Sequence, residues 1–350
     1  MYKTIPVRPG EELNLAAVGD YLREHLPGYS GGPLEVEQFP TGASNLTYLI
    51  YGGGWEGVLR RPPMGPVAPK AHDMVREARL LAKLHPVFPL APKPYVICDD
   101  PSVIGAPFYV MEPRQGVVLD RSVPREWRGR ELNFRLISER LVETLVELHQ
   151  VDWQAAGLTD IGHPEGYLQR QVEGWIGRYQ RAKTEEVPEA DQIARWMTDH
   201  LPASPPPTIV HNDYKLNNVV LDEQDPTRIV AVLDWEMSTV GDPLTDVGAL
   251  LAYWLEPGEE VGDLLTSVTT LPGFMKRDEL LEVYARKSGR DLSQIGFYLA
   301  FSYFKVAVIV QQIYFRWAKG QTRDPRFATL GQMAVHLLKQ AVRVSQTVRP

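Results

Sequence analysis

The sequence contains one cysteine, Cys98, among 350 residues. A single thiol excludes an internal disulfide, and such sparing use of cysteine is typical of a reducing compartment. Cys98 ends a short apolar stretch, residues 95–98, so we expect a small buried side chain on a strand. An excess of positive charge is also absent, because 37 Lys and Arg stand against 44 Asp and Glu and the net charge is −7. That balance gives no electrostatic footprint for binding nucleic acid.

From the scarcity of long uncharged apolar runs we expect neither a signal peptide nor a membrane-spanning helix. The first residues, MYKTIPVRPGEE, lack the apolar segment of a signal peptide. The most hydrophobic run, residues 297–310, is interrupted by Lys305 and followed by two glutamines, so it should fall short of a membrane-spanning helix. We therefore expect a cytoplasmic protein with no membrane partner. A chain of this length can bury the core of one two-lobed unit or of two closely packed domains.

The stretch TIVHNDYKLNNVVLDEQDPTRIVAVLDWE carries the densest group of polar side chains. A polar loop comes first, and two apolar runs, residues 218–221 and 229–234, then flank a turn at Pro226. This pattern predicts a β-hairpin. If the hairpin is symmetric about Pro226, Asn218 lies directly opposite Asp234. Because side chains alternate along a strand, both would then share one face.

An amide oxygen and a carboxylate held together suit Mg²⁺, which takes one or two protein ligands and keeps its other positions for phosphate and water. Asp213 stands just before Asn218 in the pattern His-x-Asp-x-x-x-x-Asn, and Asp234 ends the next strand. Kinase catalytic loops combine a base Asp, a metal-binding Asn and a second metal-binding Asp in this order. A lone His or Asp beside a turn is usually a satisfied loop residue, but the combination predicts a phosphotransferase site. His211 is expected to shape the loop.

The motifs HNDYKLNNVVLD, LDWE and GDPLTDVG resemble those of the aminoglycoside and choline kinase-like phosphotransferase family. Members of this family are relatives of protein kinases that act on small molecules. The motifs are closest to those of the branch found fused to acyl-CoA dehydrogenases. The resemblance implies an α+β, protein kinase-like two-lobed fold, whose small lobe has a five-stranded antiparallel sheet and a helix and whose larger lobe is mainly helical. The division it implies is a nucleotide-binding lobe at residues 1–112, a hinge at 113–116, and a helical lobe with the catalytic loop and substrate pocket at 117–350.

The N-terminal third has the pattern expected of that small lobe. A helix is predicted over residues 13–26, followed by strands at 35–39, 46–51 and 57–61. A turn of small residues joins the first two strands, and such turns place backbone N–H groups over ATP phosphates in kinase-like enzymes. The full G-x-G-x-x-G motif is absent, and an ordinary hairpin loop would look similar. The phosphate-contact candidates are Gly42, Ser44 and Asn45.

A helix predicted over residues 73–84 carries a carboxylate on its apolar stripe. This residue, Glu77, needs a partner if it faces inward. Arg60 on the third strand is the candidate, although the sequence leaves open whether Arg60 or Arg61 points inward. The resemblance implies a lysine here that contacts nucleotide phosphates and pairs with the helix Glu. Arginine keeps the charge and can bind phosphate with two hydrogen bonds, but its fork geometry differs from that of an ammonium.

Strands at residues 95–98 and 108–112 are expected to complete the sheet, and the following residues resemble the hinge of kinase-like folds. The resemblance implies that this segment contacts adenine through a backbone carbonyl and an N–H two residues later. Pro113 has no N–H to donate, so we expect the Glu112 carbonyl and the Arg114 N–H to be used. Met111 would pack at the back of the pocket. The alternative is a plain interlobe linker.

Helical periodicity dominates the rest of the chain. Helices are predicted over residues 132–151, 167–179 and 192–201. Asp242, in a Gly-Asp-Pro turn, should cap another helix. Asp246 falls in that helix's first turn, where a carboxylate suits the helix dipole. The resemblance implies instead that Asp246 holds the catalytic loop by accepting backbone N–H bonds.

Together these residues predict transfer of the γ-phosphoryl group of ATP or GTP to a hydroxyl of a small molecule. Asp213 would accept the hydroxyl proton, Asn218 and Asp234 would hold Mg²⁺, and Arg60 would help neutralise the phosphates. Lys305 or Arg316 on a buried face of the aromatic C-terminal third would be notable, because cations are rarely buried unpaired. These two cations and the aromatic residues favour a hydroxyacyl or other anionic acceptor. The alternatives are an aminoglycoside or choline-type kinase with a carboxylate-lined pocket for a cationic substrate, and a catalytically silent nucleotide-binding module.

Overall fold

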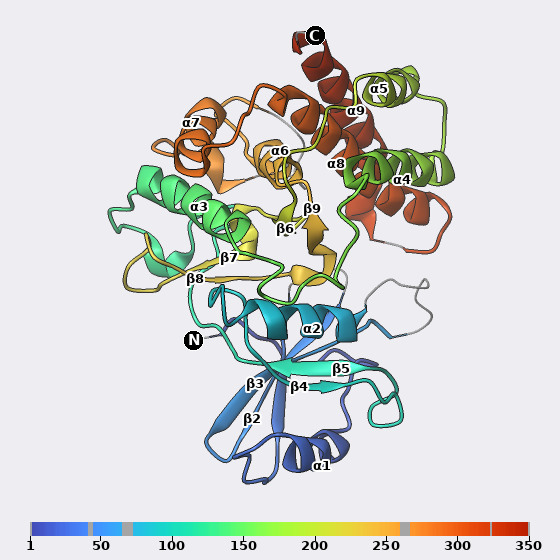
Figure 1. Cartoon of the computed structure of the whole chain (residues 1–350). Helices are drawn as coiled ribbons and strands as arrows, with labels where there is room; N and C mark the ends of the chain where they lie inside the picture. The colour runs from blue at the N-terminus through green and yellow to red at the C-terminus, as the bar shows by residue number, and fades with distance from the viewer. Residues whose placement is uncertain (1, 41–44, 65–72, 260–266, 323, 349–350) are drawn as a thin grey trace. The chain divides into compact units, whose positions relative to one another are not determined.

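The computed structural model describes residues 2–40, 45–64, 73–259, 267–322 and 324–348, and the chain folds into two compact units (Figure 1). Unit 1 comprises Met1–Val118, Gln154–Ile161 and Val219–Ser238. Unit 2 comprises Leu119–Trp153, Gly162–Asn218 and Thr239–Pro350. The chain therefore passes between the units several times. The lobe boundaries expected from the sequence stay a prediction.

Unit 1 contains the five-stranded antiparallel sheet that the sequence predicted. Its strand order is β1 (Glu35–Gln38), β2 (Leu46–Gly52), β3 (Trp55–Arg61), β5 (Phe108–Met111) and β4 (Pro94–Cys98). Two left-handed glycines, Gly53 and Gly54, form the two-residue turn between β2 and β3, where positive φ angles match the twist of a hairpin. Cys98 is fully buried on β4, as expected.

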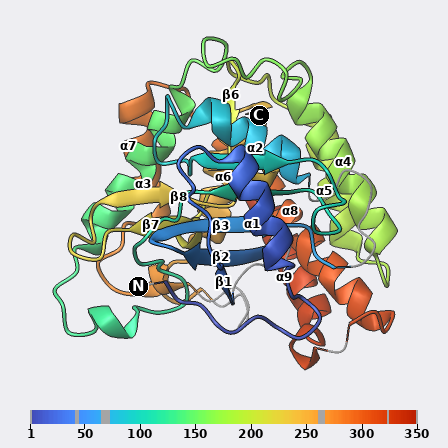
Figure 2. The ribbon, with the colours of Figure 1, turned by 90° about the horizontal axis from the view of Figure 1, so that it is seen from below.

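Two helices lie on opposite faces of this sheet (Figure 1). α1 (Leu15–His25) crosses the strands in Figure 2, and its Val18 and Leu22 join one apolar cluster with residues of the sheet. α2 (Met74–Leu84) packs against β4 and β5 and is capped by Asp73, whose carboxylate accepts the Arg76 N–H. The predicted stripe of α2 is confirmed, because Met74, Ala78, Leu81 and Leu84 are buried.

Unit 1 also contains the hairpin of β7 (Val219–Leu221) and β8 (Ile229–Val232), and its register corrects the sequence prediction. Val219 pairs with Val232, one position away from a hairpin symmetric about Pro226. A hydrogen bond from the Asp222 N–H to the Arg228 carbonyl centres the turn one residue earlier, and a bulge in β8 then shifts the ladder.

Neither predicted metal ligand belongs to a strand of this hairpin. Asn218 ends the 3₁₀ turn η2 (Leu216–Asn218), just before β7. Asp234 follows β8 with a left-handed φ of 68° and precedes the turn η3 (Trp235–Met237). The expectation that strand alternation puts both side chains on one face was therefore wrong, since alternation applies only inside a strand.

Unit 2 is mainly helical, as predicted. Its short sheet pairs β6 (Thr208–Val210) with β9 (Thr239–Gly241). Its helices are α3 (Phe134–His149), α4 (Tyr167–Ala182), α5 (Pro188–Asp199), α6 (Leu244–Tyr253), α7 (Arg277–Ser288), α8 (Ile295–Ala318) and α9 (Leu330–Thr347), with short 3₁₀ turns η1 (Arg125–Trp127), η5 (Val268–Thr270) and η6 (Pro325–Phe327). α5 begins four residues before the predicted start, because Pro188 occupies a first-turn position that suits proline.

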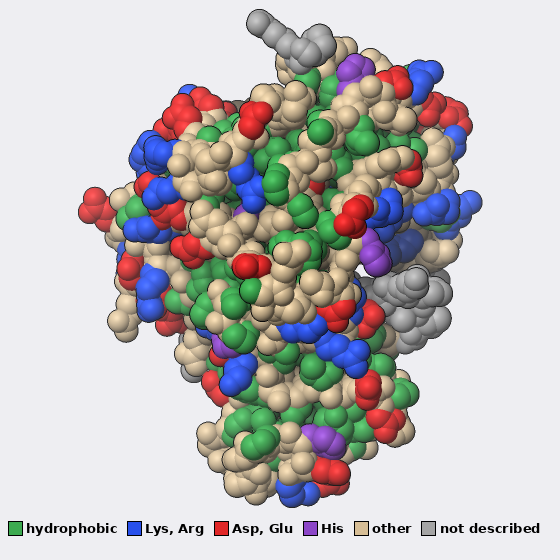
Figure 3. Space-filling model, in the orientation of Figure 1, with side chains coloured by type: hydrophobic (Ala, Val, Ile, Leu, Met, Phe, Trp, Pro, Cys, Tyr) green, Lys and Arg blue, Asp and Glu red, His purple; other side chains and the backbone are tan. Residues whose placement is uncertain are grey.

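α8 is the central helix of unit 2 and packs against α4, α6 and α9. Gly248 of α6 permits close packing, because a Cβ there would lie 2.5 Å from the Tyr298 carbonyl oxygen. By length and composition alone α8 could cross a membrane, contrary to the expectation from its sequence. Within its most apolar 18-residue segment, however, 67% of the residues are buried inside the protein. On the face shown in Figure 3, acidic and basic side chains are interspersed.

Candidate active site

The loop after β6 carries the predicted catalytic base. The Asp213 carboxylate accepts a hydrogen bond from the Asn218 Nδ2 at 2.9 Å and one from the Lys215 Nζ at 3.0 Å. The Asn218 Nδ2 also donates to the Asp213 carbonyl at 2.8 Å. The Asp213 side chain remains 19% exposed. The predicted base and the predicted ligand Asn218 are therefore brought together within unit 2, and the Asp213 carboxylate stays partly accessible to solvent.

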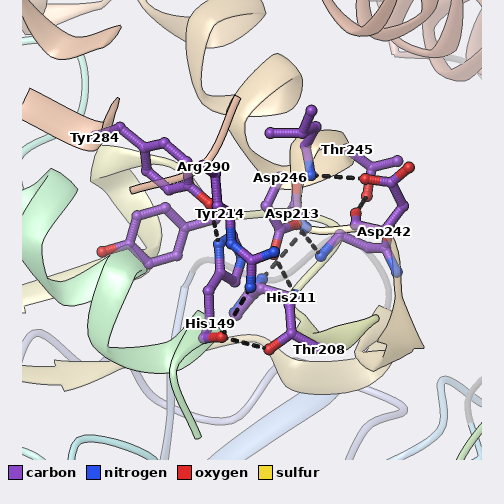
Figure 4. A network of polar contacts seen from close by, with 12 residues as sticks. His149, Thr208, His211, Asp213, Tyr214, Asp242, Thr245, Asp246, Tyr284 and Arg290 are labelled. Atoms are coloured by element: carbon purple, nitrogen blue, oxygen red, sulfur yellow. Dashed lines mark hydrogen bonds and ion pairs between the residues drawn. The ribbon is translucent and has the colours of Figure 1, made fainter. Parts of the chain in front are cut away.

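Asp246 fixes the start of this loop (Figure 4). One carboxylate oxygen accepts the His211 N–H and the other accepts the Asn212 N–H, each at 2.6 Å. Asp246 is fully buried. Burial alone would raise its pKa, but the hydrogen bond and charge of His149 lower that pKa below its ordinary value. The structure thus contains the contacts that the family resemblance implied for Asp246.

The cap of α6 differs slightly from the prediction. Pro243 occupies the N-cap position that the sequence assigned to Asp242. The Asp242 carboxylate still accepts the Leu244 N–H at 2.9 Å, because a side chain one residue earlier can reach the exposed amides of the first turn. Its second oxygen accepts the Tyr298 hydroxyl at 2.7 Å, which ties the start of α6 to α8.

A buried histidine links Asp246 to α7 (Figure 4). The His149 Nε2 lies 3.3 Å from the Asp246 carboxylate, and the Nδ1 lies 2.8 Å from the Tyr284 hydroxyl. The His149 carbonyl accepts the Thr208 hydroxyl at 2.7 Å, which anchors β6. Burial lowers the pKa of His149, although the contact with Asp246 acts in the opposite direction.

The lowered pKa of His149 leads to an expected pH effect. The unfolded chain binds this proton more readily than the folded protein, since the ordinary value is 6.5. The contribution to stability is therefore complete above about pH 6.5 and is lost as the pH falls. We expect the free energy of unfolding of a His149→Gln variant to depend less on pH between about pH 5 and 6.5 than that of the parent. Urea titrations at closely spaced pH values measure this, and equal slopes would contradict it.

In unit 1, Arg60 is the arginine that faces α2. Its Nη1 donates to the Glu77 Oε1 at 2.6 Å, and both residues are buried. Arg61 points to the other face of the sheet and donates to the Ile104 carbonyl at 3.1 Å. Burial alone would lower the pKa of Arg60, but the charge of Glu77 raises it. The ion pair expected from the sequence is thus confirmed.

Arg60 also contacts the predicted metal ligand of unit 1. Its Nη2 lies 3.3 Å from the Asp234 Oδ1, so one guanidinium bridges the two carboxylates Glu77 and Asp234. The Arg60 Nε is buried and has no hydrogen-bond partner within the described part of the chain.

Removing Glu77 should destabilise the protein strongly. A Glu77→Ala variant leaves the Arg60 guanidinium buried with one partial partner, and breaking a buried pair in this way costs about 3–5 kcal/mol of folding free energy. Chemical denaturation measures the change. Glu24→Ala on the exposed side of α1 is the matched control, for which we expect a change within about 0.5 kcal/mol. Equal effects of the two substitutions would contradict the importance of this pair.

The phosphate-loop candidates are only partly within the described residues. Gly42 and Ser44 lie outside them. Asn45 is buried, and its Nδ2 donates to the Glu236 Oε2 at 2.7 Å. Glu236 was not singled out from the sequence, although it stands two residues after Asp234 in the LDWE motif. This contact connects the end of the β1–β2 loop to the segment that carries Asp234.

The predicted hinge is held by its own side chains. Met111 is buried at the end of β5, and the Glu112 N–H donates to the Lys93 carbonyl at 2.8 Å. The Arg114 guanidinium pairs with the Glu112 carboxylate and donates to the Val230 carbonyl at 3.2 Å. These bonds order the segment after β5. The adenine contacts through the Glu112 carbonyl and the Arg114 N–H stay predictions.

Comparison with known proteins identifies the family. The model of the phosphotransferase enzyme family matches residues 35–289. The chain belongs to this family. It is 36% identical over 329 residues to the rat (Rattus norvegicus) acyl-CoA dehydrogenase family member 11, covering 91% of the chain and 41% of that protein. It is 35% identical over 344 residues to the mouse (Mus musculus) acyl-CoA dehydrogenase family member 10, covering 97% and 32%. The chain therefore spans less than half the length of these relatives.

Solved structures agree with this assignment. A putative aminoglycoside phosphotransferase from Ralstonia eutropha superposes with a TM-score of 0.82 at 32% identity, covering 97% of the chain and 100% of that structure. Choline kinase from Cryptosporidium parvum has a TM-score of 0.59 at 14% identity, with coverages of 93% and 97%, and shows the fold alone. By family, the protein is a small-molecule phosphotransferase with a protein kinase-like fold, as its motifs predicted.

Two lysines of this phosphotransferase, Lys215 and Lys305, make contacts that were not predicted from the sequence. Lys215 stands two residues after the predicted base, and its Nζ lies 4.6 Å from the centre of the Tyr253 ring. The position of Lys215 two residues after Asp213, in the motif HNDYK, was the signal in the sequence that could have identified it. Lys305 was noted as a cation in an apolar helix, but its contact with the catalytic loop depends on tertiary structure. Arg316, the other cation considered for a buried face, is exposed.

Proposed function

We propose that this phosphotransferase moves the γ-phosphoryl group of ATP or GTP to a hydroxyl of a small molecule. The observation that carries the proposal is the Asp213 carboxylate, held by Asn218 and Lys215 on a loop fixed by Asp246. A carboxylate fixed in this way can accept the hydroxyl proton as the oxygen attacks phosphorus. Holding the acceptor in line with the phosphoryl group would supply much of the remaining rate enhancement.

The available oxygen donors fit Mg²⁺. Asn218 uses its Nδ2 to bind Asp213, and its Oδ1 accepts no hydrogen bond from the residues that the structure describes. Asp234 supplies a carboxylate that is 34% exposed. An amide oxygen and a carboxylate are the kinds of hard-oxygen ligand that magnesium uses beside phosphates. Across the described ranges, no group of three or more His, Cys, Asp or Glu side chains is arranged around a metal position. When bound, Mg²⁺ would neutralise phosphate charge.

The nucleotide would use the residues of unit 1. Arg60, held by Glu77, would place a positive charge beside the phosphates. The turn with Gly42, Ser44 and Asn45 would supply further donors. Adenine or guanine would pair with the backbone of Glu112 and Arg114 and pack on Met111. An aminoglycoside phosphotransferase solved as a ternary complex with ADP and hygromycin B has a TM-score of 0.60 at 16% identity, covering 94% of this chain and 98% of that structure.

The acceptor is proposed to be a hydroxyacyl compound or another anionic hydroxyl substrate. Two lysines lie at the catalytic loop. Lys215 belongs to the loop and binds the Asp213 carboxylate, and Lys305 on α8 donates to the Asn212 carbonyl. Positive charge at this position favours an anionic partner. The acyl-CoA dehydrogenases that the chain resembles suggest an acyl thioester. A cationic acceptor is the second candidate, favoured by similarity to the putative aminoglycoside phosphotransferase of Ralstonia eutropha.

A panel of anionic, neutral and cationic hydroxyl acceptors tests this function. The chain is incubated with Mg·ATP or Mg·GTP and a hydroxyacyl thioester, the free hydroxy acid, a neutral alcohol of the same length, choline or an aminoglycoside, and phosphorylated product is measured by mass spectrometry. We expect kcat/KM for an anionic acceptor to exceed that for the neutral alcohol by about 10-fold or more. Turnover of the cationic acceptors alone would reverse the assignment. Nucleotide binding without any product would favour a silent binding module.

A further inference from the structure

Lys305 is a buried cation without a carboxylate partner within ion-pair distance among the described residues. It lies in the middle of α8 and is only 9% exposed. Its Nζ donates to the Asn212 carbonyl at 2.6 Å and lies 5.5 Å from the centre of the Trp175 ring on α4. Burying an ammonium is costly unless its contacts compensate, and a backbone carbonyl with an aromatic ring is a small set of partners.

The surrounding charges show where this cation acts. Burial lowers the pKa of Lys305, whereas the charges of Asp213 and Asp246 raise it. Lys215 and Arg178 act in the same direction as burial. The acidic groups that favour the ammonium form are therefore the predicted base and the residue that fixes its loop. Lys305 belongs electrostatically to the catalytic loop, although it lies 93 residues away in the sequence.

The residue that Lys305 contacts is held at three points. Asn212 has a left-handed backbone with φ of 65°, which is uncommon for a residue with a side chain. Its N–H donates to Asp246, its side-chain oxygen accepts the Tyr167 hydroxyl at 2.8 Å, and its carbonyl accepts Lys305. Such a conformation persists only where its surroundings fix it.

The carbonyl of Asn212 and the N–H of Asp213 belong to the same peptide group. Because a peptide group is planar, fixing the carbonyl oxygen also fixes the direction of the next N–H. That N–H donates to the His211 Nδ1 at 3.3 Å. The peptide plane is therefore held from one side by the Lys305 ammonium and from the other by the His211 ring. The Cα of Asp213 lies in this plane, bonded to its nitrogen, and carries the carboxylate side chain.

We propose that Lys305 is a positioning residue for phosphoryl transfer, holding the peptide plane between Asn212 and Asp213 so that the Asp213 carboxylate keeps its orientation. The proposal rests on the proposed role of Asp213 as the base. Catalytic groups must be held within a fraction of an ångström of the productive geometry, and supporting hydrogen bonds provide that precision. Lys305 acts through Asn212 and touches no reacting atom in this assignment.

The test compares Lys305→Met and Lys305→Gln with the parent and with Lys319→Met, an exposed lysine just after α8. Hydrogen–deuterium exchange of the peptide spanning residues 211–216 reports loop order without any need for turnover. We expect faster exchange there in both Lys305 variants, and parent behaviour for Lys319→Met. In the acceptor assay we expect kcat to fall about 10- to 100-fold, with the nucleotide KM within about 3-fold of the parent.

The two readouts separate this proposal from the proposed function. Faster loop exchange in a protein that phosphorylates no acceptor would support the positioning role and contradict the transferase. Parent-like exchange and parent-like kcat in Lys305→Met would overturn the positioning role. If Lys305→Met does not fold, Lys305→Gln keeps a neutral donor on α8, and parent values of both quantities in that variant would overturn it equally. A loss of thermal stability with unchanged kcat would also overturn it, because that result describes a packing residue.

Discussion

An Asp213→Asn variant should keep its fold and lose phosphoryl transfer, with kcat lower by about 10²- to 10⁴-fold. Asparagine has the same shape, and its amide oxygen can still accept from Asn218 and Lys215. It cannot take up a proton, and it carries no charge. The loss should therefore appear in kcat, with little change in the affinity for Mg-nucleotide, because unit 1 is untouched by the substitution.

The comparison needs a control of the same chemistry. Asp199→Asn, at the exposed end of α5, makes the same change of charge outside the catalytic loop. We expect its kcat to match that of the parent. Initial rates with saturating Mg-nucleotide and a saturating acceptor measure the effect. An Asp213→Asn protein as active as the Asp199→Asn protein would remove Asp213 as the base.

An Asp246→Asn substitution should lower the free energy of unfolding by about 3–5 kcal/mol. Each Asp246 oxygen accepts a short backbone N–H bond, from His211 and from Asn212. An asparagine replaces one of these oxygens with an NH₂ group, which would face an N–H donor at a buried position. The contact of Asp246 with His149 would also lose its charge.

Chemical denaturation of Asp246→Asn measures this loss, and the Asp199→Asn protein again provides the reference. Hydrogen exchange should show where the damage lies, because the amides of His211 and Asn212 are the ones released. Unfolding free energies of the two variants within about 1 kcal/mol of each other would contradict a central structural role for Asp246.

The helical periodicity of the sequence predicted one part of the site, the ion pair between Glu77 and an arginine. Glu77 falls on the apolar stripe of α2, so its burial and its need for a cation followed from the spacing alone. The choice between Arg60 and Arg61 could not be made, since both are buried and only the pairing of the strand decides which face each one occupies. The pattern thus predicted the ion pair and left the identity of the arginine to the fold.

The hairpin register illustrates what a pattern cannot supply. Turn contacts decide it: the Asp222 carboxylate accepts two backbone N–H bonds, and Asp225 binds Thr227. These contacts centre the turn, and a bulge in β8 then shifts the pairing by one residue. A symmetric count about Pro226 includes neither effect. Asn218 and Asp234 consequently lie outside the strands in which alternation was expected to align them.

The contact of Lys215 with the Tyr253 ring and the contacts of Glu236 and Lys305 depend on tertiary structure. Lys305 donates to a backbone carbonyl, and every residue has one, so its partner leaves no trace in the sequence. Glu236 binds Asn45, which is 191 residues away. Motif spacing and the family resemblance predicted Asp213, Asn218, Asp234 and Asp246, whereas the contacts of Glu236 and Lys305 became visible only in the folded structure.

The most direct test of the central claim follows the phosphoryl group itself. The chain is given Mg²⁺, the best acceptor from the panel, and nucleotide whose γ-phosphate carries ¹⁸O at its nonbridging oxygens. We expect these labelled oxygens to arrive on the acceptor, esterified through the acceptor's own unlabelled oxygen, with one nucleoside diphosphate formed per product. Label recovered only in inorganic phosphate, or remaining only in bound nucleotide, would contradict transfer to a hydroxyl.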